Sequence, residues 1–221
     1  MKITIDIETR PPHLDESERY AIAVTSKKNP KRTDDTRAAW AQDTTNQLEA
    51  MNGLALNPYR GRICVISASI DGGKPETWGH WDDEAAVVRA FASWVPTNGD
   101  QVYWVGHSIA AFDIVWLREA CLRARTYPDV RRLYRLLPLK RFDGRILDNM
   151  VEAMGPAGRT MPSAQLLSES AGVTDKGEHV TMDWAALWAQ GADSLPELMA
   201  RCEADVRAEW ARRAAVEEMY E

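Results

Sequence analysis

Two acidic side chains lie two positions apart near the start of the chain. They belong to the segment 2–8, in which isoleucine occupies every second position and Asp6 and Glu8 stand among the polar residues between. This alternation predicts a β-strand that projects both carboxylates from one face, about 7 Å apart along the backbone. Such a pair can share one hard cation, although the solvated face of an amphipathic strand is the commoner meaning of the pattern.

Two further acids accompany the apolar stripes of expected helices. Asp113 lies four residues after Ile109 and four before Leu117, so helical spacing places it among inward-pointing residues. A buried carboxylate is costly unless a base, hydrogen-bond donors or a metal ion compensate it, so Asp113 indicates either a satisfied buried acid or a metal ligand. Asp205 lies along the inward edge of the last helix and, taken alone, is typical of a surface acid.

These four acids come from one strand and two helices that an α/β topology can bring to one sheet edge. All four offer oxygen ligands, which suit Mg²⁺ or Mn²⁺ rather than Zn²⁺. Two such ions about 3.5–4 Å apart can activate a water and stabilise the leaving oxygen in phosphodiester hydrolysis. The set therefore predicts a two-ion hydrolytic site, whereas four unrelated surface acids would bind no divalent ion.

The rest of the chain predicts a mixed β-sheet flanked by α-helices. The turn residues 71–73 suit a hairpin, Ser108 suits the cap of the helix that follows it, and Asp148 suits the start of a short helix. Residues 10–31 show no clear period and favour a loop. The expected strands are 2–8, 62–70, 74–81 and 101–106, and the expected helices are 34–51, 82–95, 109–125, 163–171, 183–190 and a long one from about 195.

Length and composition favour one globular domain over residues 1–221, with an inserted arm at about 10–58. The chain contains 45% hydrophobic and 27% charged residues, which argues against disorder. The start of the sequence lacks a signal peptide, no apolar run could span a membrane, and the three cysteines are far apart, so we expect a cytoplasmic protein.

The net charge of −6 argues against a protein that binds nucleic acid through its overall charge. The segment 118–145 is different, because it holds nine basic residues against three acidic ones. Two interpretations stay open for this segment: a local basic face for nucleic acid, or a solvated helix surface.

The four acids fall within three short motifs: Asp-Ile-Glu-Thr at 6–9, Gly-His-Ser-Ile-Ala-Ala-Phe-Asp at 106–113 and Cys-Glu-Ala-Asp-Val at 202–206. In this order and spacing they resemble the motifs of DEDD-type 3′–5′ exonucleases of the DnaQ-like, ribonuclease H-like superfamily. The likeness is greatest to exonucleases related to the exonuclease domain of B-family DNA polymerases. The resemblance implies a ribonuclease H-like sheet and hydrolysis at the 3′ end of single-stranded nucleic acid, DNA more than RNA.

The resemblance also assigns roles to the acids. Asp6, Glu8 and Asp205 would bind the first metal ion, and Asp6 with Asp113, partly through water, the second. All four would be catalytic, and replication or repair proteins would be further partners. The candidate substrate-binding residues are Thr9, His107, Ser108 and Arg201.

Arg201 departs from the resembled pattern, which has a water-orienting tyrosine four residues before the last acid. A guanidinium cannot accept a proton at neutral pH, so Arg201 would instead bind the phosphate or water, or pair with Asp205 and compete with the metal ion. His179, in a loop that could overhang the site, is a candidate replacement, and Asp148 is a further candidate site residue. The alternative function is a catalytically weak or inactive nucleic-acid-binding or replication-accessory domain.

Overall fold

The computed structural model describes residues 1–26, 29, 31, 33–96, 101–140, 143–154, 167, 169 and 184–220. The chain divides into two compact units. The sheet unit comprises Met1–Glu8, Ile63–Val180 and Leu195–Glu221, and the helical unit comprises Thr9–Arg62 and Thr181–Ser194. The expected arm at 10–58 falls within the helical unit. Within the described ranges, no helix combines the length and apolar character that crossing a membrane requires.

The sheet unit is built on a five-stranded mixed sheet in the order β3-β2-β1-β4-β5. Its strands are β1 (Lys2–Arg10), β2 (Arg62–Ile70), β3 (Glu76–Gly79), β4 (Tyr103–Gly106) and β5 (Ile146–Asp148). β1 is the central strand of this order. β3 is antiparallel to β2, whereas β1, β4 and β5 are parallel. The predicted α/β class and mixed sheet are confirmed, and the topology is consistent with a ribonuclease H-like core.

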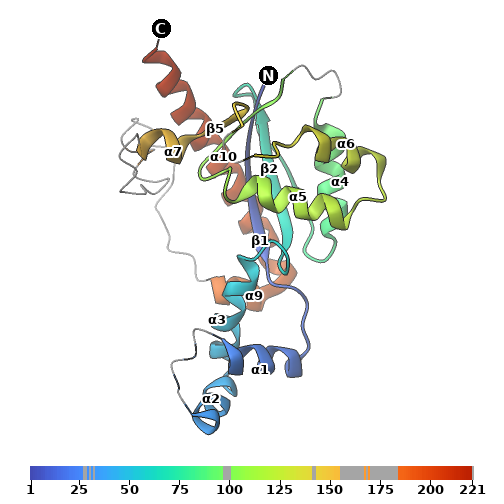
Figure 1. Cartoon of the computed structure of the whole chain (residues 1–221), viewed down its shortest axis with the longest axis vertical. Helices are drawn as coiled ribbons and strands as arrows, with labels where there is room; N and C mark the ends of the chain where they lie inside the picture. Colours follow the sequence, from blue (N-terminus) through green and yellow to red (C-terminus); the bar gives the residue numbers. More distant parts are fainter. Residues whose placement is uncertain are drawn as a thin grey trace. The chain divides into compact units, whose positions relative to one another are not determined.

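Helices cover both faces of this sheet (Figure 1). The isoleucine face of β1 forms a hydrophobic core with residues of α4, α5 and α6, while α10 packs against β3 and β4. The fit of α10 on β3 is close, because a Cβ added at Gly79 would lie 2.8 Å from the sulfur of Met199. In the described part of this unit the helices are α4 (Glu84–Trp94), α5 (Asp113–Arg123), α6 (Pro128–Leu136), α7 (Asn149–Met154) and α10 (Leu195–Glu218).

The helical unit corrects the loop expected at residues 10–31. This stretch contains α1 (Glu16–Thr25), whose start is a capping box in which the Asp15 side chain accepts from the Glu18 backbone and the Glu18 side chain accepts from the Asp15 backbone. The helix expected at 34–51 is two helices, because Asp43 caps a new one. The other helices of this unit are α2 (Asp34–Ala41), α3 (Thr44–Ala55) and α9 (Trp184–Gln190), followed by a 3₁₀ turn at Gly191–Ser194.

Two local predictions are confirmed and one is wrong. The hairpin after β2 uses left-handed residues, with φ of 46° at Asp71 and 75° at Gly72. Asp148 opens α7 by accepting hydrogen bonds from the backbones of Met150 and Val151. Ser108 does not cap a helix at 109–125, because α5 begins only at Asp113. Most of the helix expected at 163–171 lies outside the described residues.

Candidate metal centre

Two carboxylates of β1 meet a third from α10, almost 200 residues later in the chain. One ligand oxygen from each of Asp6, Glu8 and Asp205 lies within 4.8 Å of the others. The strand alternation turns Asp6 and Glu8 away from the isoleucine face of β1. The Cys202 thiol donates a hydrogen bond to the Asp6 carbonyl oxygen at 3.2 Å, which attaches α10 to the strand one turn before Asp205. The three carboxylates could hold one metal ion.

The environment of Glu8 disfavours its negative charge. The residue is only 8% exposed, and burial raises the pKa of its carboxyl group well above the usual range. The neighbouring charge of Asp6 raises this pKa further, whereas Arg201 opposes the shift. A bound divalent cation would relieve both the desolvation and the repulsion between the acids.

Arg201 supplies the counter-charge at this cluster. Its Nε lies 3.2 Å from Oε1 of Glu8 and 3.8 Å from Oδ2 of Asp205. The sequence raised the pairing with Asp205 as one of several possibilities, and the structure adds the shorter contact with Glu8. The guanidinium therefore contacts two of the three carboxylates that a metal ion would need.

Asp113 is the fourth acid of the predicted set, and it lies at the start of α5. It is 3% exposed, and among the described residues its Oδ1 has no hydrogen-bond partner. Burial raises the pKa of its carboxyl group well above the usual range, and the nearby charge of Asp6 is the next largest cause. A buried oxygen without a donor beside another carboxylate is costly for the protein alone but suits a cation ligand.

The backbone leading to Asp113 is held by Asp148. The two carboxylate oxygens of Asp148 accept hydrogen bonds from the backbone N–H groups of Ser108, at 3.0 Å, and Ala110, at 3.3 Å. Ser108 adopts a left-handed φ of 55°, a conformation that Asn and Gly tolerate better than Ser. Asp148 is therefore a positioning residue, because its oxygens are engaged with the loop and with the start of α7.

The remaining sequence candidates are His107, Thr9 and His179. His107 is half-buried in the loop between β4 and α5. Thr9 is buried, and its hydroxyl donates to the Ala55 carbonyl at 2.8 Å within the helical unit. His179 lies outside the described residues.

The sequence reasoning missed a buried pair beside the acids. The Asn149 side-chain amide donates to a carboxylate oxygen of Glu209 at 2.7 Å and to the Glu209 carbonyl at 3.1 Å. Glu209 is 3% exposed, lies one helical turn after Asp205, and contributes to the raised pKa of Asp113. Glu209 could have been predicted from the sequence, because it follows Asp205 by four residues and so lies on the same inward side of α10.

The donor set fits a hard divalent cation. It consists of carboxylate oxygens, and the unpartnered Oδ1 of Asp113 adds a ligand atom for which the described protein provides no donor. Comparison with protein-family models, with curated proteins and with solved structures finds no match for this chain.

Proposed function

We propose that this protein is a metal-dependent 3′–5′ exonuclease of the DEDD type, acting on single-stranded nucleic acid, DNA more than RNA. The observation that carries the proposal is the clustering of Asp6, Glu8 and Asp205 within 4.8 Å. The order of the three sequence motifs supports it, and so does the α/β fold around a central β1. The resemblance of the motifs is greatest to exonucleases related to the exonuclease domain of B-family DNA polymerases.

The residues of the site have different roles in binding the metal ions and in positioning one another. Asp6, Glu8 and Asp205 would hold one Mg²⁺ or Mn²⁺ ion, and Asp6 with Asp113, partly through water, would hold a second. When bound, the ions supply water activation and neutralise charge on the phosphoryl group. Asp148 positions the Asp113 loop through its backbone hydrogen bonds, so that the buried carboxylate stays beside Asp6.

Arg201 has a substrate-binding role in this proposal. Its side chain is 35% exposed, so the guanidinium can leave Glu8 and turn towards solvent and substrate. A guanidinium donates bidentate hydrogen bonds to phosphate, but it cannot act as a general base at neutral pH. Selectivity for a strand end then comes from contacts to phosphate and sugar rather than from reading the bases.

The same Arg201 contacts favour a second candidate, a nucleic-acid-binding domain with weak or no catalysis. The guanidinium sits against Glu8 and Asp205 at 3.2 and 3.8 Å and opposes a cation there. If metal binding cannot overcome these contacts, the fold binds a strand without cutting it.

A nuclease assay separates the two candidates. A 5′-labelled single-stranded oligonucleotide is incubated with the protein and Mg²⁺ or Mn²⁺, with a chelator in parallel. The proposal expects a ladder that shortens from the 3′ end only with metal, and its loss in Asp113→Asn. Glu203→Gln is the control, because it also removes one carboxylate, but from a residue that pairs with Arg207 on α10 and lies outside the acidic cluster.

Each result of this assay with the unaltered protein supports one candidate function and contradicts the other. Retained oligonucleotide binding without metal-dependent shortening would establish the binding domain instead. Shortening that persists in Asp113→Asn would show that the activity comes from another source. Arg201→Tyr, which restores the residue type of the resembled pattern, should raise the rate if water orientation limits it.

A further inference from the structure

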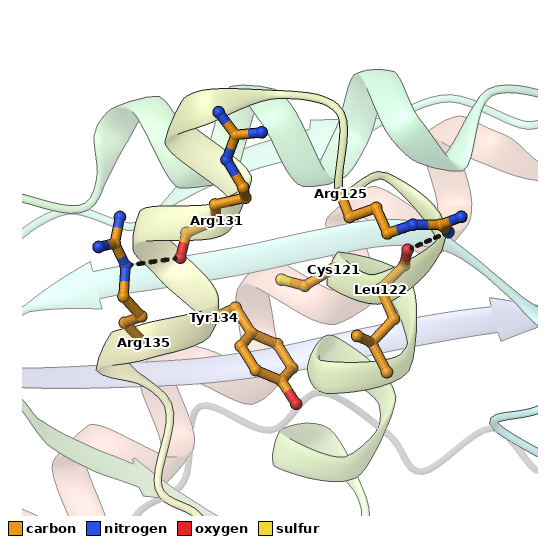
Figure 2. A pocket seen from close by; sticks show the side chains of 6 residues that line it. All are labelled: Cys121, Leu122, Arg125, Arg131, Tyr134 and Arg135. Atoms are coloured by element: carbon orange, nitrogen blue, oxygen red, sulfur yellow. Dashed lines mark hydrogen bonds between the residues drawn. The ribbon is translucent and has the colours of Figure 1, made fainter.

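A cavity lies on the sheet unit, away from the carboxylate cluster. It has a volume of about 380 Å³ and lies at the α5–α6 hairpin (Figure 2). Its lining residues are Cys121, Leu122, Arg125, Arg131, Tyr134 and Arg135, and we call this cavity the arginine cleft. The size lies within the range of pockets that hold small organic ligands.

Among the described residues, the three arginines of the cleft have no acidic partners. Arg125 donates to the Leu122 carbonyl at 3.0 Å, and Arg135 donates to the Arg131 carbonyl at 3.3 Å. None of the three forms an ion pair with any carboxylate in the part of the chain that the structure describes. Arg131 and Arg135 are one helical turn apart, a like-charge pair that destabilises a helix by a few tenths of a kcal/mol. The protein alone gains no stability from this arrangement.

The floor of the cleft is uncharged. Cys121 is 2% exposed, and burial raises the pKa of its thiol to about 12, so it carries no negative charge at neutral pH. Tyr134 is held in place by Arg118, which donates to its hydroxyl at 3.0 Å and covers one face of its ring at 4.9 Å from the centroid, so the other face is the one available to a ligand. Leu122 is 41% exposed. The lining is therefore complementary to a ligand that combines negative charge with an apolar body, such as an aromatic ring.

We propose that the arginine cleft binds a nucleotide unit of single-stranded nucleic acid, with the base against Tyr134 and Leu122 and the phosphates of the strand at the surrounding arginines, whose guanidinium groups point in different directions (Figure 2). This inference rests on the proposed function, because the strand is the substrate of that reaction. A phosphate supplies the charge that the guanidinium groups lack, and a nucleobase supplies the flat apolar surface. The cleft then adds a strand contact outside the carboxylate cluster.

The test measures binding without cleavage. Fluorescence anisotropy of a labelled oligothymidylate of about 12 nucleotides is recorded in the presence of a chelator and over a series of salt concentrations. Arg131→Ala should weaken binding by about tenfold and reduce the slope of log K against log salt by about 0.7, the value for one lost phosphate contact on a single strand. Leu122→Glu should weaken binding similarly, because the new carboxylate competes with phosphate.

Two variants with the same changes in charge are the controls. Arg207→Ala removes an exposed arginine from α10, and Leu56→Glu changes another exposed leucine, in the helical unit. Both should bind the oligonucleotide within about twofold of the unaltered protein, since neither lines the cleft. Equal losses in the controls, or no loss in Arg131→Ala, would overturn the inference.

Competition identifies the ligand chemistry. Thymidine monophosphate should displace the oligonucleotide from the unaltered protein at lower concentration than inorganic phosphate does. Equal potency of the two would show a simple anion site and overturn the nucleotide assignment.

The inference and the proposed function fail separately. Metal-dependent shortening together with unchanged oligonucleotide binding by Arg131→Ala would refute nucleotide binding at the cleft but support the exonuclease proposal. Oligonucleotide binding that is weakened by Arg131→Ala, without metal-dependent shortening by the unaltered protein, would refute the exonuclease proposal but support nucleotide binding at the cleft. Thermal melting of each variant shows that it folds, as expected for exposed positions.

Discussion

Replacing Arg201 with glutamine should increase the affinity of the protein for divalent metal ions. The guanidinium contacts two of the carboxylates that would bind the ion, at 3.2 Å for Glu8 and 3.8 Å for Asp205. With an effective dielectric constant of about 20, each contact has a Coulomb energy of roughly 4–5 kcal/mol. A metal ion must disrupt this attraction before it can bind both carboxylates.

Solvent reduces the size of this effect. The Arg201 side chain is 35% exposed, and desolvation of the charges offsets much of the attraction. After this discount each contact contributes about 0.5–1 kcal/mol, so the two together oppose the metal by about 1–2 kcal/mol. Arg201→Gln should therefore bind Mn²⁺ about 5–30-fold more tightly.

Calorimetric titration with Mn²⁺ measures this change directly. Arg207→Gln is the control, because it removes another arginine that pairs with an acid four residues away on α10. Its Mn²⁺ affinity should stay within about twofold of the unaltered protein. Equal or weaker Mn²⁺ binding by Arg201→Gln would refute the competition between the guanidinium and the ion.

Three further predictions concern the stability of the site. Asp113→Asn should raise the melting temperature of the metal-free protein, because it removes a buried charge beside Asp6; an unchanged or lower value would contradict the buried-charge argument. The metal-free protein should resist denaturant better at pH about 5 than at pH about 8, because the pKa values of Glu8 and Asp113 are raised by burial. The stabilisation is present in full below the usual carboxyl pKa and is lost as the pH rises through the raised values, so Asp113→Asn should reduce the pH difference. Ser108→Asn should stabilise the protein slightly, whereas Ser108→Val should cost about 1–2 kcal/mol in chemical denaturation, because φ is 55° there; equal stability of the two would argue against backbone strain.

Several features could be predicted from the sequence because their causes are local. The alternation in residues 2–8 determines which face of β1 carries Asp6 and Glu8, since side chains alternate along any strand. The periodic residues after Leu195 predicted the long helix that carries Asp205. The capping box at Asp15 and Glu18 is an equally local signal for α1, but the lack of a clear period in residues 10–31 led to the prediction of a loop there.

Tertiary structure decided the start of α5 and the surroundings of Arg201. The periodic pattern ran back to Ile109, but the loop before Asp113 is held in a turn by Asp148, which comes from another strand. The contact between Arg201 and Glu8 joins α10 to β1, and no helical or strand period encodes a pairing over such a sequence distance. Periodicity assigns a residue to a face of its own element, whereas the packing of the elements selects which charges meet there.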